Sequence, residues 1–190
     1  MKDCLVIIDM VNGFVNEGAL ADKRINKITP NIEKLIKGAM SNGTPIIVFK
    51  DTHAEDDEEF NTYPPHCIKG TNECELIPEL KKYEKNFHII EKNTTNGFKT
   101  EMFQHLVKWI EFDRVIVTGC CTDICVRDFS LSYMNYIKNT GAKTQIIVPE
   151  NAVETFDAPN HNATQHNKKA LAEMKKNGIF VVNDLENTRG

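Results

Sequence analysis

The sequence lacks the features that define several large classes of protein. Its apolar runs have the length of a β-strand, whereas a membrane-spanning helix needs about 20 consecutive apolar residues. Its formal net charge is −4 at pH 7, which gives no support to binding of nucleic acid or of an anionic membrane. It has no internal repeat, low-complexity segment or dividing linker. We therefore expect one domain over residues 1–190 whose partner is a small molecule.

The cysteines do not form the pairs that mark metal ribbons or redox motifs. None of the six belongs to a Cys-x-x-Cys pair, which excludes a zinc ribbon and a thioredoxin-like site. The first residues include charges, and the apolar run Leu5–Ile8 is short, so we expect a first β-strand there and not a secretory signal. Cysteines in such a chain indicate free thiols in a reducing cytoplasm, which is the expected location.

The composition and the apolar pattern predict an α/β domain. Hydrophobic residues make up 41% of the chain and charged residues 26%, as in ordinary globular proteins, and 190 residues suffice for a substantial core. Short β-branched runs alternate with segments of helical spacing. The order predicts one doubly wound, Rossmann-like parallel sheet with helices on both faces. The expected strands are 5–8, 44–49, 87–90, 114–118, 144–148 and 179–182, and the expected helices include 30–40, 99–112, the stretch after Cys125, and 163–176.

Chemically active side chains follow several of the expected strands. Open parallel sheets bind ligands at the carboxyl ends of their strands, so these side chains should meet at one edge. Each residue taken alone has a plain alternative: an aspartate can cap a turn, and a lysine at a strand end is usually a surface charge. Their convergence nevertheless predicts a single active site, which includes Asp9, Asp51, His53, Lys92 and Cys125.

The stretch around Cys125 has the pattern of a nucleophile turn. A β-branched run ends at Gly119, a short polar turn follows, and Cys125 falls in the first turn of the helical segment that comes next. Unpaired N–H groups and the helix dipole favour a thiolate there and can stabilise an oxyanion. The arrangement is typical of a nucleophile elbow built around sulfur. The alternative is a cysteine that is simply a small buried apolar residue.

A candidate metal site follows the second expected strand. Asp51-Thr-His53 places a carboxylate and an imidazole on one side of an extended segment, and His66 follows Pro64-Pro65. An acidic run, Glu55–Glu59, lies between them. On chemistry alone, a solvated acidic loop with solvated histidines is the more common case.

The motif from Gly119 to Val126 resembles the nucleophile motif of the isochorismatase-like cysteine hydrolases, and of nicotinamidases in particular, and the resemblance extends over nearly the whole chain. It implies that Cys125 is the nucleophile, that a cis peptide precedes Cys121, and that the backbone N–H groups of Cys121 and Cys125 form the oxyanion hole. Asp9-Met-Val-Asn-Gly-Phe14 is similar to the opening segment of that family. By this resemblance Asp9 is the acid–base residue and Phe14 lines the substrate ring, while Val11 and Gly13 depart from the pattern.

The same resemblance implies a metal set and a lysine. The metal ligands are then Asp51, His53, His66 and a fourth residue that lies between His53 and His66 in the sequence. We choose Glu59, seven residues before His66, as the fourth ligand, with Glu58 as the alternative. They would hold one divalent ion, with zinc as the first choice and iron or manganese as alternatives. Lys92 matches the lysine of the catalytic set. Asn93, Thr94 and Thr95 depart from the aromatic residue that many nicotinamidases have there, so Phe98 is expected to face the ring instead.

The implied activity is that of an amidohydrolase that converts nicotinamide to nicotinate and ammonia through a cysteine thioester, as in NAD salvage, with pyrazinamide as a related substrate. Two alternatives remain: a hydrolase of another small amide, a ureide or isochorismate, and a non-catalytic metal- or partner-binding protein. The Asp9–Lys92–Cys125 set disfavours the second alternative, because binding needs no activated thiol. His161 and His166 are interpreted as capping or solvated residues. A homo-oligomer is compatible with the sequence.

Overall fold

The protein is built on one six-stranded parallel sheet. The computed structural model describes residues 2–185 and places the strands in the order β3-β2-β1-β4-β5-β6. This arrangement confirms the predicted doubly wound sheet. The strands are β1 (Asp3–Ile8), β2 (Ile46–Asp51), β3 (Phe87–Lys92), β4 (Arg114–Gly119), β5 (Gln145–Pro149) and β6 (Phe180–Val182).

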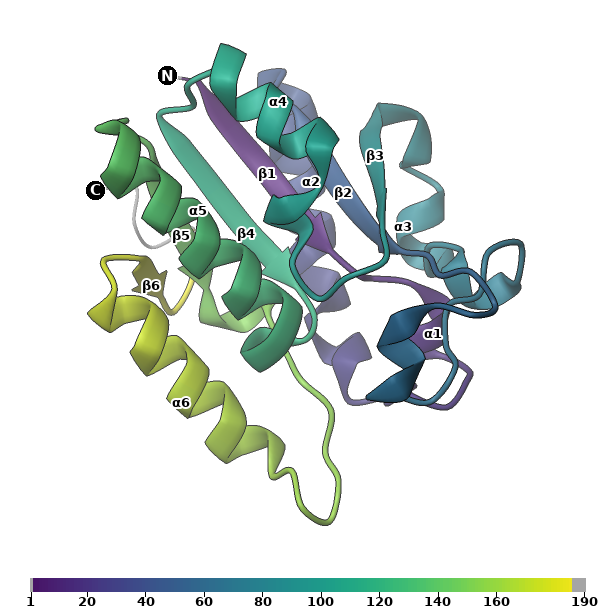
Figure 1. Ribbon diagram of the computed structural model, residues 1–190. Helices are drawn as coiled ribbons and strands as arrows, with labels where there is room; N and C mark the ends of the chain where they lie inside the picture. The colour runs from purple at the N-terminus through teal and green to yellow at the C-terminus, as the bar shows by residue number, and fades with distance from the viewer. Residues whose placement is uncertain (1, 186–190) are drawn as a thin grey trace.

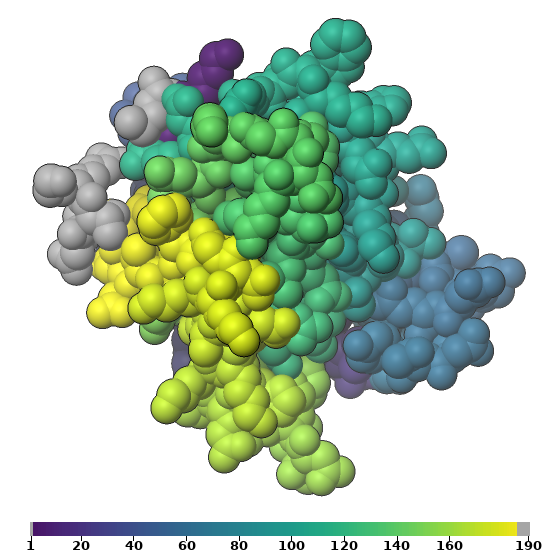
Figure 2. Space-filling view, turned by 60° about the vertical axis from the view of Figure 1, so that its left-hand side comes forward, coloured from purple at the N-terminus to yellow at the C-terminus, as the bar shows by residue number. Residues whose placement is uncertain are grey.

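Helices cover both faces of the sheet (Figure 1). One face carries the helices α4, α5 and α6, and the other carries α2 and α3. The space-filling view shows α6 and the loop before it, coloured yellow-green, on the surface of the molecule (Figure 2). The α-helices are α1 (Asn12–Val15), α2 (Thr29–Asn42), α3 (Pro78–Lys81), α4 (Glu101–Trp109), α5 (Arg127–Thr140) and α6 (Ala163–Lys176). No helix in residues 2–185 is long and apolar enough to cross a membrane.

Alternate residues of β1 enter two different cores. Cys4, Val6 and Ile8 pack under α4, α5 and α6, whereas Leu5 and Ile7 pack under α2. Successive side chains of a strand point to opposite faces, and a strand covered on both faces therefore reads as an unbroken apolar run. This is why the run Leu5–Ile8 predicted a buried parallel strand.

Two expected helices differ from the observed ones at their starts. The segment expected over residues 99–112 forms a 3-10 turn at Gly97–Lys99 before α4, since the Asn96 side chain accepts a hydrogen bond from the Phe98 N–H. The stretch around Cys125 forms a separate π-helical turn, Thr122–Val126, which leads directly into α5.

The centre of the sheet is its switch point. The chain winds from β1 to β2 and β3 on one side, then crosses to β4 on the other, so a crevice opens beyond the carboxyl ends of β1 and β4. Gly119 ends β4 with φ +108, and a Cβ there would lie 2.0 Å from the Ile8 carbonyl oxygen. Only glycine permits this conformation and this approach. The turn that carries Cys125 thus starts directly beside the end of β1.

Candidate active site

A buried chain of ion pairs joins the ends of β1, β2 and β3. The Lys92 ammonium lies 2.8 Å from Asp9 Oδ2 and 2.6 Å from Asp51 Oδ1. The register of the sheet pairs Asp51 directly with Lys92, and Ile8, the residue before Asp9, pairs with Phe49 of β2. All three charged side chains are buried. Two carboxylates that face one ammonium compensate its burial, and their charges raise the pKa of Lys92 well above its usual value against the opposing effect of burial.

Asp9 has the properties of a general base. Burial raises its pKa to about 7, while the Lys92 charge lowers it, the Asp51 charge raises it, and hydrogen bonds from Lys92 and the Cys125 thiol lower it. A carboxyl group whose pKa lies near neutral pH can both accept and return a proton. Its backbone has φ +54, in the left-handed region that aspartate tolerates better than most residues. Asp9, for which a turn cap was the alternative interpretation, is therefore a buried carboxyl group that can titrate.

Cys125 lies on the cavity side of the π-helical turn, next to Asp9. Burial raises the pKa of its thiol well above the ordinary value; the Lys92 charge opposes this shift, and the Asp9 and Asp51 charges reinforce it. The expectation that the helix start favours a resting thiolate is therefore wrong. Desolvation and two carboxylates outweigh the helix N-terminus and Lys92, so the resting group is a thiol beside a base.

Cys121 and Cys120 take separate roles in the turn. The peptide between them is cis, as the family resemblance implied. The Cys120 thiol donates to the Asp9 carbonyl oxygen at 3.1 Å and lies fully inside the protein. Within residues 2–185 the Cys121 N–H has no hydrogen-bond partner, while its carbonyl oxygen accepts from the N–H groups of Ile124 and Val126. A free N–H at the edge of a cavity is the kind of donor that an oxyanion hole needs.

Asp51, His53 and His66 form a compact group of metal-binding side chains. Asp51 Oδ2 lies 2.9 Å from His53 Nε2 and 3.1 Å from His66 Nε2. His66 Nδ1 lies 2.8 Å from the Pro64 carbonyl oxygen, which can only accept, so this nitrogen carries a hydrogen and Nε2 faces the carboxylate. The hydrogen bond to Asp51 raises the pKa of His66 against the effect of burial, so a proton on Nε2 can fill this contact, as can a metal ion. Zinc ligands at about 2.1 Å from a tetrahedral ion lie roughly 3.4 Å apart, so the group needs to widen only slightly to hold a metal ion.

The acidic loop adds Glu59 and Asp57 to this group. Glu59 is half-buried, lines the cavity, and has its pKa raised by burial and by the Asp51 charge, whereas Glu58 is exposed. Glu59 lies outside the compact group of Asp51 and the two histidines. Asp57, which the sequence did not single out, lies 3.3 Å from His53 Nδ1 and can orient that ring.

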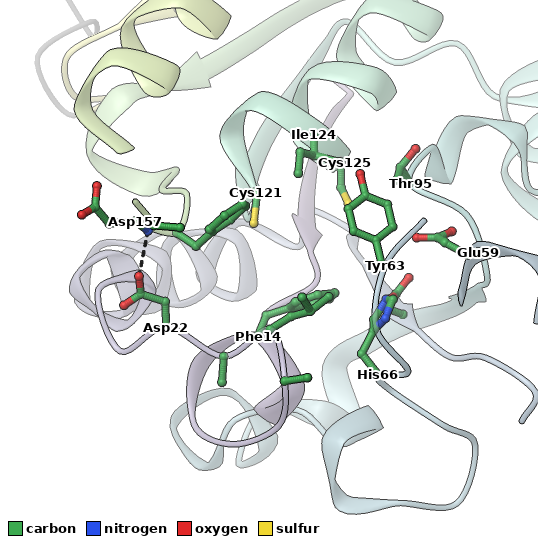
Figure 3. Close-up of a pocket in the computed structure, with 16 residues that line it drawn as sticks. Phe14, Asp22, Glu59, Tyr63, His66, Thr95, Cys121, Ile124, Cys125 and Asp157 are labelled. Carbon is green, nitrogen blue, oxygen red and sulfur yellow. Dashed lines mark hydrogen bonds and ion pairs between the residues drawn. The ribbon is translucent and has the colours of Figure 1, made fainter. Parts of the chain in front are cut away.

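One cavity of about 590 Å³ is lined by Asp51, Glu59, His66, Cys121 and Cys125, whereas Asp9, His53 and Lys92 are buried and do not line it (Figure 3). Its size is that of a small-molecule site. Phe14 lies at its base, with its ring centroid 5.6 Å from that of His66, and the sulfur atoms of Cys121 and Cys125 face into it. Tyr63 and Phe156 also line it, and sequence reasoning missed both. Tyr63 lies directly before Pro64-Pro65 and His66 in the sequence, and this position beside an expected metal ligand could have identified it.

Two further expectations about the site are wrong. Phe98 does not face this cavity: its ring packs in the core against Phe103 and stacks on Tyr133 with centroids 5.4 Å apart. The turn at Gly97–Lys99 directs the side chain under α5, and Thr95 lines the cavity from this segment.

The second error concerns the two histidines near the start of α6. Neither is a cap, because the N-cap of α6 is Asn162, and both contact Asp123. His161 is mostly buried, and only His166 is partly exposed to solvent. No local pattern connects residues 38 and 43 positions apart.

Comparison with known proteins assigns the chain to a family. A family model described as the isochorismatase domain matches residues 3–183. The chain belongs to the isochorismatase family. It is 35% identical over 177 residues to nicotinamidase 1 of Arabidopsis thaliana, covering 84% of this chain and 72% of that protein. The family and this relative support an amidohydrolase, that is, a nicotinamidase or a related hydrolase.

Solved structures of this family share the whole fold. A nicotinamidase from Bacillus subtilis superposes with a TM-score of 0.81 at 28% identity, covering 96% of this chain and 99% of that one. The N-carbamoylsarcosine amidase of Thermoplasma acidophilum superposes with a TM-score of 0.78, also at 28% identity, covering 96% of both chains. Members of the family that share this fold to a similar degree therefore act on different amides.

Proposed function

We propose that this protein hydrolyses nicotinamide to nicotinate and ammonia through a thioester on Cys125, as a step of NAD salvage. The observation that carries the proposal is the placement of two chemistries at one cavity. A thiol beside a buried carboxyl group lies on one side, and the group formed by Asp51, His53 and His66 lies on another. The first suits attack on a carboxamide, and the second suits placement of a ring that carries a nitrogen atom.

Asp9 and Lys92 prepare the thiol for attack. Because the resting Cys125 is protonated, Asp9 takes the proton as the sulfur forms its bond to the carboxamide carbon. The Lys92 ammonium keeps its ion pair with Asp51 and its contact with Asp9, and it attracts the charge that develops on sulfur. The C–S bond forms, the carbonyl π electrons move to oxygen, and the N–H groups of Cys121 and Cys125 receive the oxyanion.

Asp9 then acts as a general acid. It gives its proton to the departing nitrogen, the C–N bond breaks, and ammonia leaves a thioester on Cys125. A water molecule takes the place of ammonia, and Asp9 accepts a proton from it as it attacks the thioester. The product is the carboxylic acid, and Cys125 regains its thiol hydrogen. A pKa near 7 suits a group that must change its protonation state in both halves of this cycle.

The second group positions the substrate. Asp51, His53 and His66, with Glu59 as a fourth donor or through a water molecule, would hold one divalent ion, with zinc as the first choice. Such an ion would supply a Lewis-acidic contact for a ring nitrogen and would so hold the ring in place. Phe14 contacts the His66 ring and can support the substrate ring beside it. Orientation of this kind brings the carboxamide carbon to Cys125, and a small misplacement there can reduce the rate on the order of a hundredfold.

Ammonia release measured with nicotinamide tests the proposal, with pyrazinamide and N-carbamoylsarcosine as comparison substrates. The second candidate function, hydrolysis of another small amide or ureide, is favoured by the amidase that shares the fold at equal identity. We expect nicotinamide to have the highest kcat/KM and Cys125→Ala to abolish release, while Cys74→Ala, which changes a thiol away from the cavity, retains it. Release from N-carbamoylsarcosine alone would support the second candidate, and no release from any amide would refute both.

A further inference from the structure

A second group of metal-binding side chains lies outside the cavity. Asp123 Oδ2 lies 2.8 Å from His161 Nε2 and 3.1 Å from His166 Nδ1. One ligand atom from each of the three residues lies within 4.8 Å of the other two. The proposed reaction uses none of these side chains, so their convergence requires another explanation.

The geometry of this group repeats that of the first. Around Asp51 the carboxylate oxygen lies 2.9 and 3.1 Å from two imidazole nitrogens, and around Asp123 it lies 2.8 and 3.1 Å from two others. Both sets of distances are slightly shorter than the roughly 3.4 Å that separates the ligands of one tetrahedral zinc ion, so each group needs to widen only slightly to hold one. Of the six histidines in the sequence, four belong to these two groups.

Hydrogen bonds around the group leave its metal-binding atoms available. His161 Nδ1 lies 3.0 Å from the Phe156 carbonyl oxygen, which can only accept, so Nδ1 carries a hydrogen and Nε2 is the ring nitrogen that faces Asp123. A histidine that binds a metal usually holds its other N–H in this way. The Thr155 hydroxyl donates to Asp123 Oδ1 at 2.6 Å, so Oδ2 is the oxygen that faces the imidazoles.

Packing fixes the inner histidine, and the outer one is open to solvent. The Phe156 ring stacks on His161 with centroids 3.9 Å apart and planes 9° apart. The His166 side chain is 35% exposed and lies in the first turns of α6. An ion therefore has an entry path, and water can complete its coordination.

We propose that Asp123, His161 and His166 form a second site for a divalent cation of the class that prefers imidazole, such as Zn²⁺ or Co²⁺. Asp123 stands in the turn between Cys121 and Cys125, and His161 belongs to the loop that supplies Phe156 and Asp157 to the cavity wall. An ion bound there joins this wall to the nucleophile turn. The site stabilises the shape of the cavity without touching the substrate.

Zinc titration of metal-free protein against a chromophoric chelator tests this inference. We expect two equivalents per wild-type chain. His166→Gln should bind one, because it removes a ligand at a half-exposed position where the fold does not depend on the ring. His105→Gln, which changes an exposed histidine of α4, is the matched control and should bind two. Co²⁺ absorption should fall to the same extent as zinc stoichiometry in each variant.

A His53→Ala background separates the two sites. There the wild-type second group should still bind one equivalent of zinc and raise the unfolding temperature, and adding His166→Gln should remove both effects. A wild-type stoichiometry of one that His53→Ala reduces to zero, or two equivalents retained by His166→Gln, would overturn the proposal. Those results would show a hydrogen-bonded Asp–His group that holds protons only. Since no arm measures turnover, the outcome is independent of the proposed hydrolysis.

Discussion

Replacement of Asp9 by asparagine removes the base and disturbs little else. Asparagine has nearly the same shape and tolerates the left-handed backbone at φ +54, whereas alanine would add strain. Lys92 keeps its 2.6 Å ion pair with Asp51, so the buried ammonium stays partnered. The cavity therefore retains its geometry, and the change in rate reports the lost proton transfer.

The expected loss is large because Asp9 is fully buried. A positioned general base contributes about 10²- to 10⁴-fold, and no bulk water reaches this position to replace it. We expect kcat/KM for ammonia release to fall about 10³- to 10⁴-fold in Asp9→Asn, or roughly 4–5.5 kcal/mol of transition-state stabilisation. Asp3→Asn is the matched control, since Asp3 lies at the other end of β1, where it pairs with Arg114. It should stay within about twofold.

The same variant should lose a pH dependence of stability. The pKa of Asp9 is about 7 in the folded protein and near 3.8 in an ordinary environment, so the folded state holds an extra proton between these values. The contribution of a carboxyl group with a raised pKa is present below pH 3.8 and falls as the pH rises to about 7. Urea unfolding of metal-free protein should show this decline in the wild type and a flatter profile in Asp9→Asn. Parallel profiles, or a kcat/KM within tenfold of the wild type, would refute the role assigned to Asp9.

Three further predictions follow from the same contacts. Lys92→Met should lower the free energy of unfolding by about 3 kcal/mol or more, since two buried carboxylates lose their cation, while Lys82→Met, at an exposed position, should leave it nearly unchanged; equal effects in urea titrations would contradict the buried ion pairs. Iodoacetamide alkylation of Cys125 in metal-free protein should accelerate steadily from pH 7 to 9, because its pKa is raised, and a plateau below pH 8 would indicate a resting thiolate. Glu59→Gln should weaken zinc retention in dialysis more than Glu58→Gln, because only Glu59 faces the cavity; the reverse order would exclude it as a ligand.

The strand ends could be predicted because their cause is local. Unbroken β-branched runs identify buried parallel strands, and parallel strands bring their carboxyl ends to one edge. Asp9, Asp51 and Lys92 meet there for that reason. The register that pairs Asp51 with Lys92 directly depends on how the strands align, and no pattern within either strand specifies it.

The wrong predictions concern properties that depend on burial and on contacts with residues distant in the sequence. The pattern around Cys125 showed a helix start but not the burial or the facing carboxylates that raise its pKa. Whether Phe98 enters the core or the cavity depends on the direction of one 3-10 turn. The contact of His161 with Asp123 joins two loops that only the folded sheet brings together.

A trap of the acyl intermediate with hydroxylamine tests the central claim most directly. Purified protein turning over nicotinamide is mixed with hydroxylamine, which intercepts a thioester as the hydroxamate, and a parallel acid-quenched sample is digested and mapped by mass spectrometry. We predict nicotinohydroxamate in place of part of the nicotinate, and a nicotinoyl group on the peptide that contains Cys125. Release of ammonia with no hydroxamate and no acylated Cys125, or an acyl group on a different cysteine, would contradict the account.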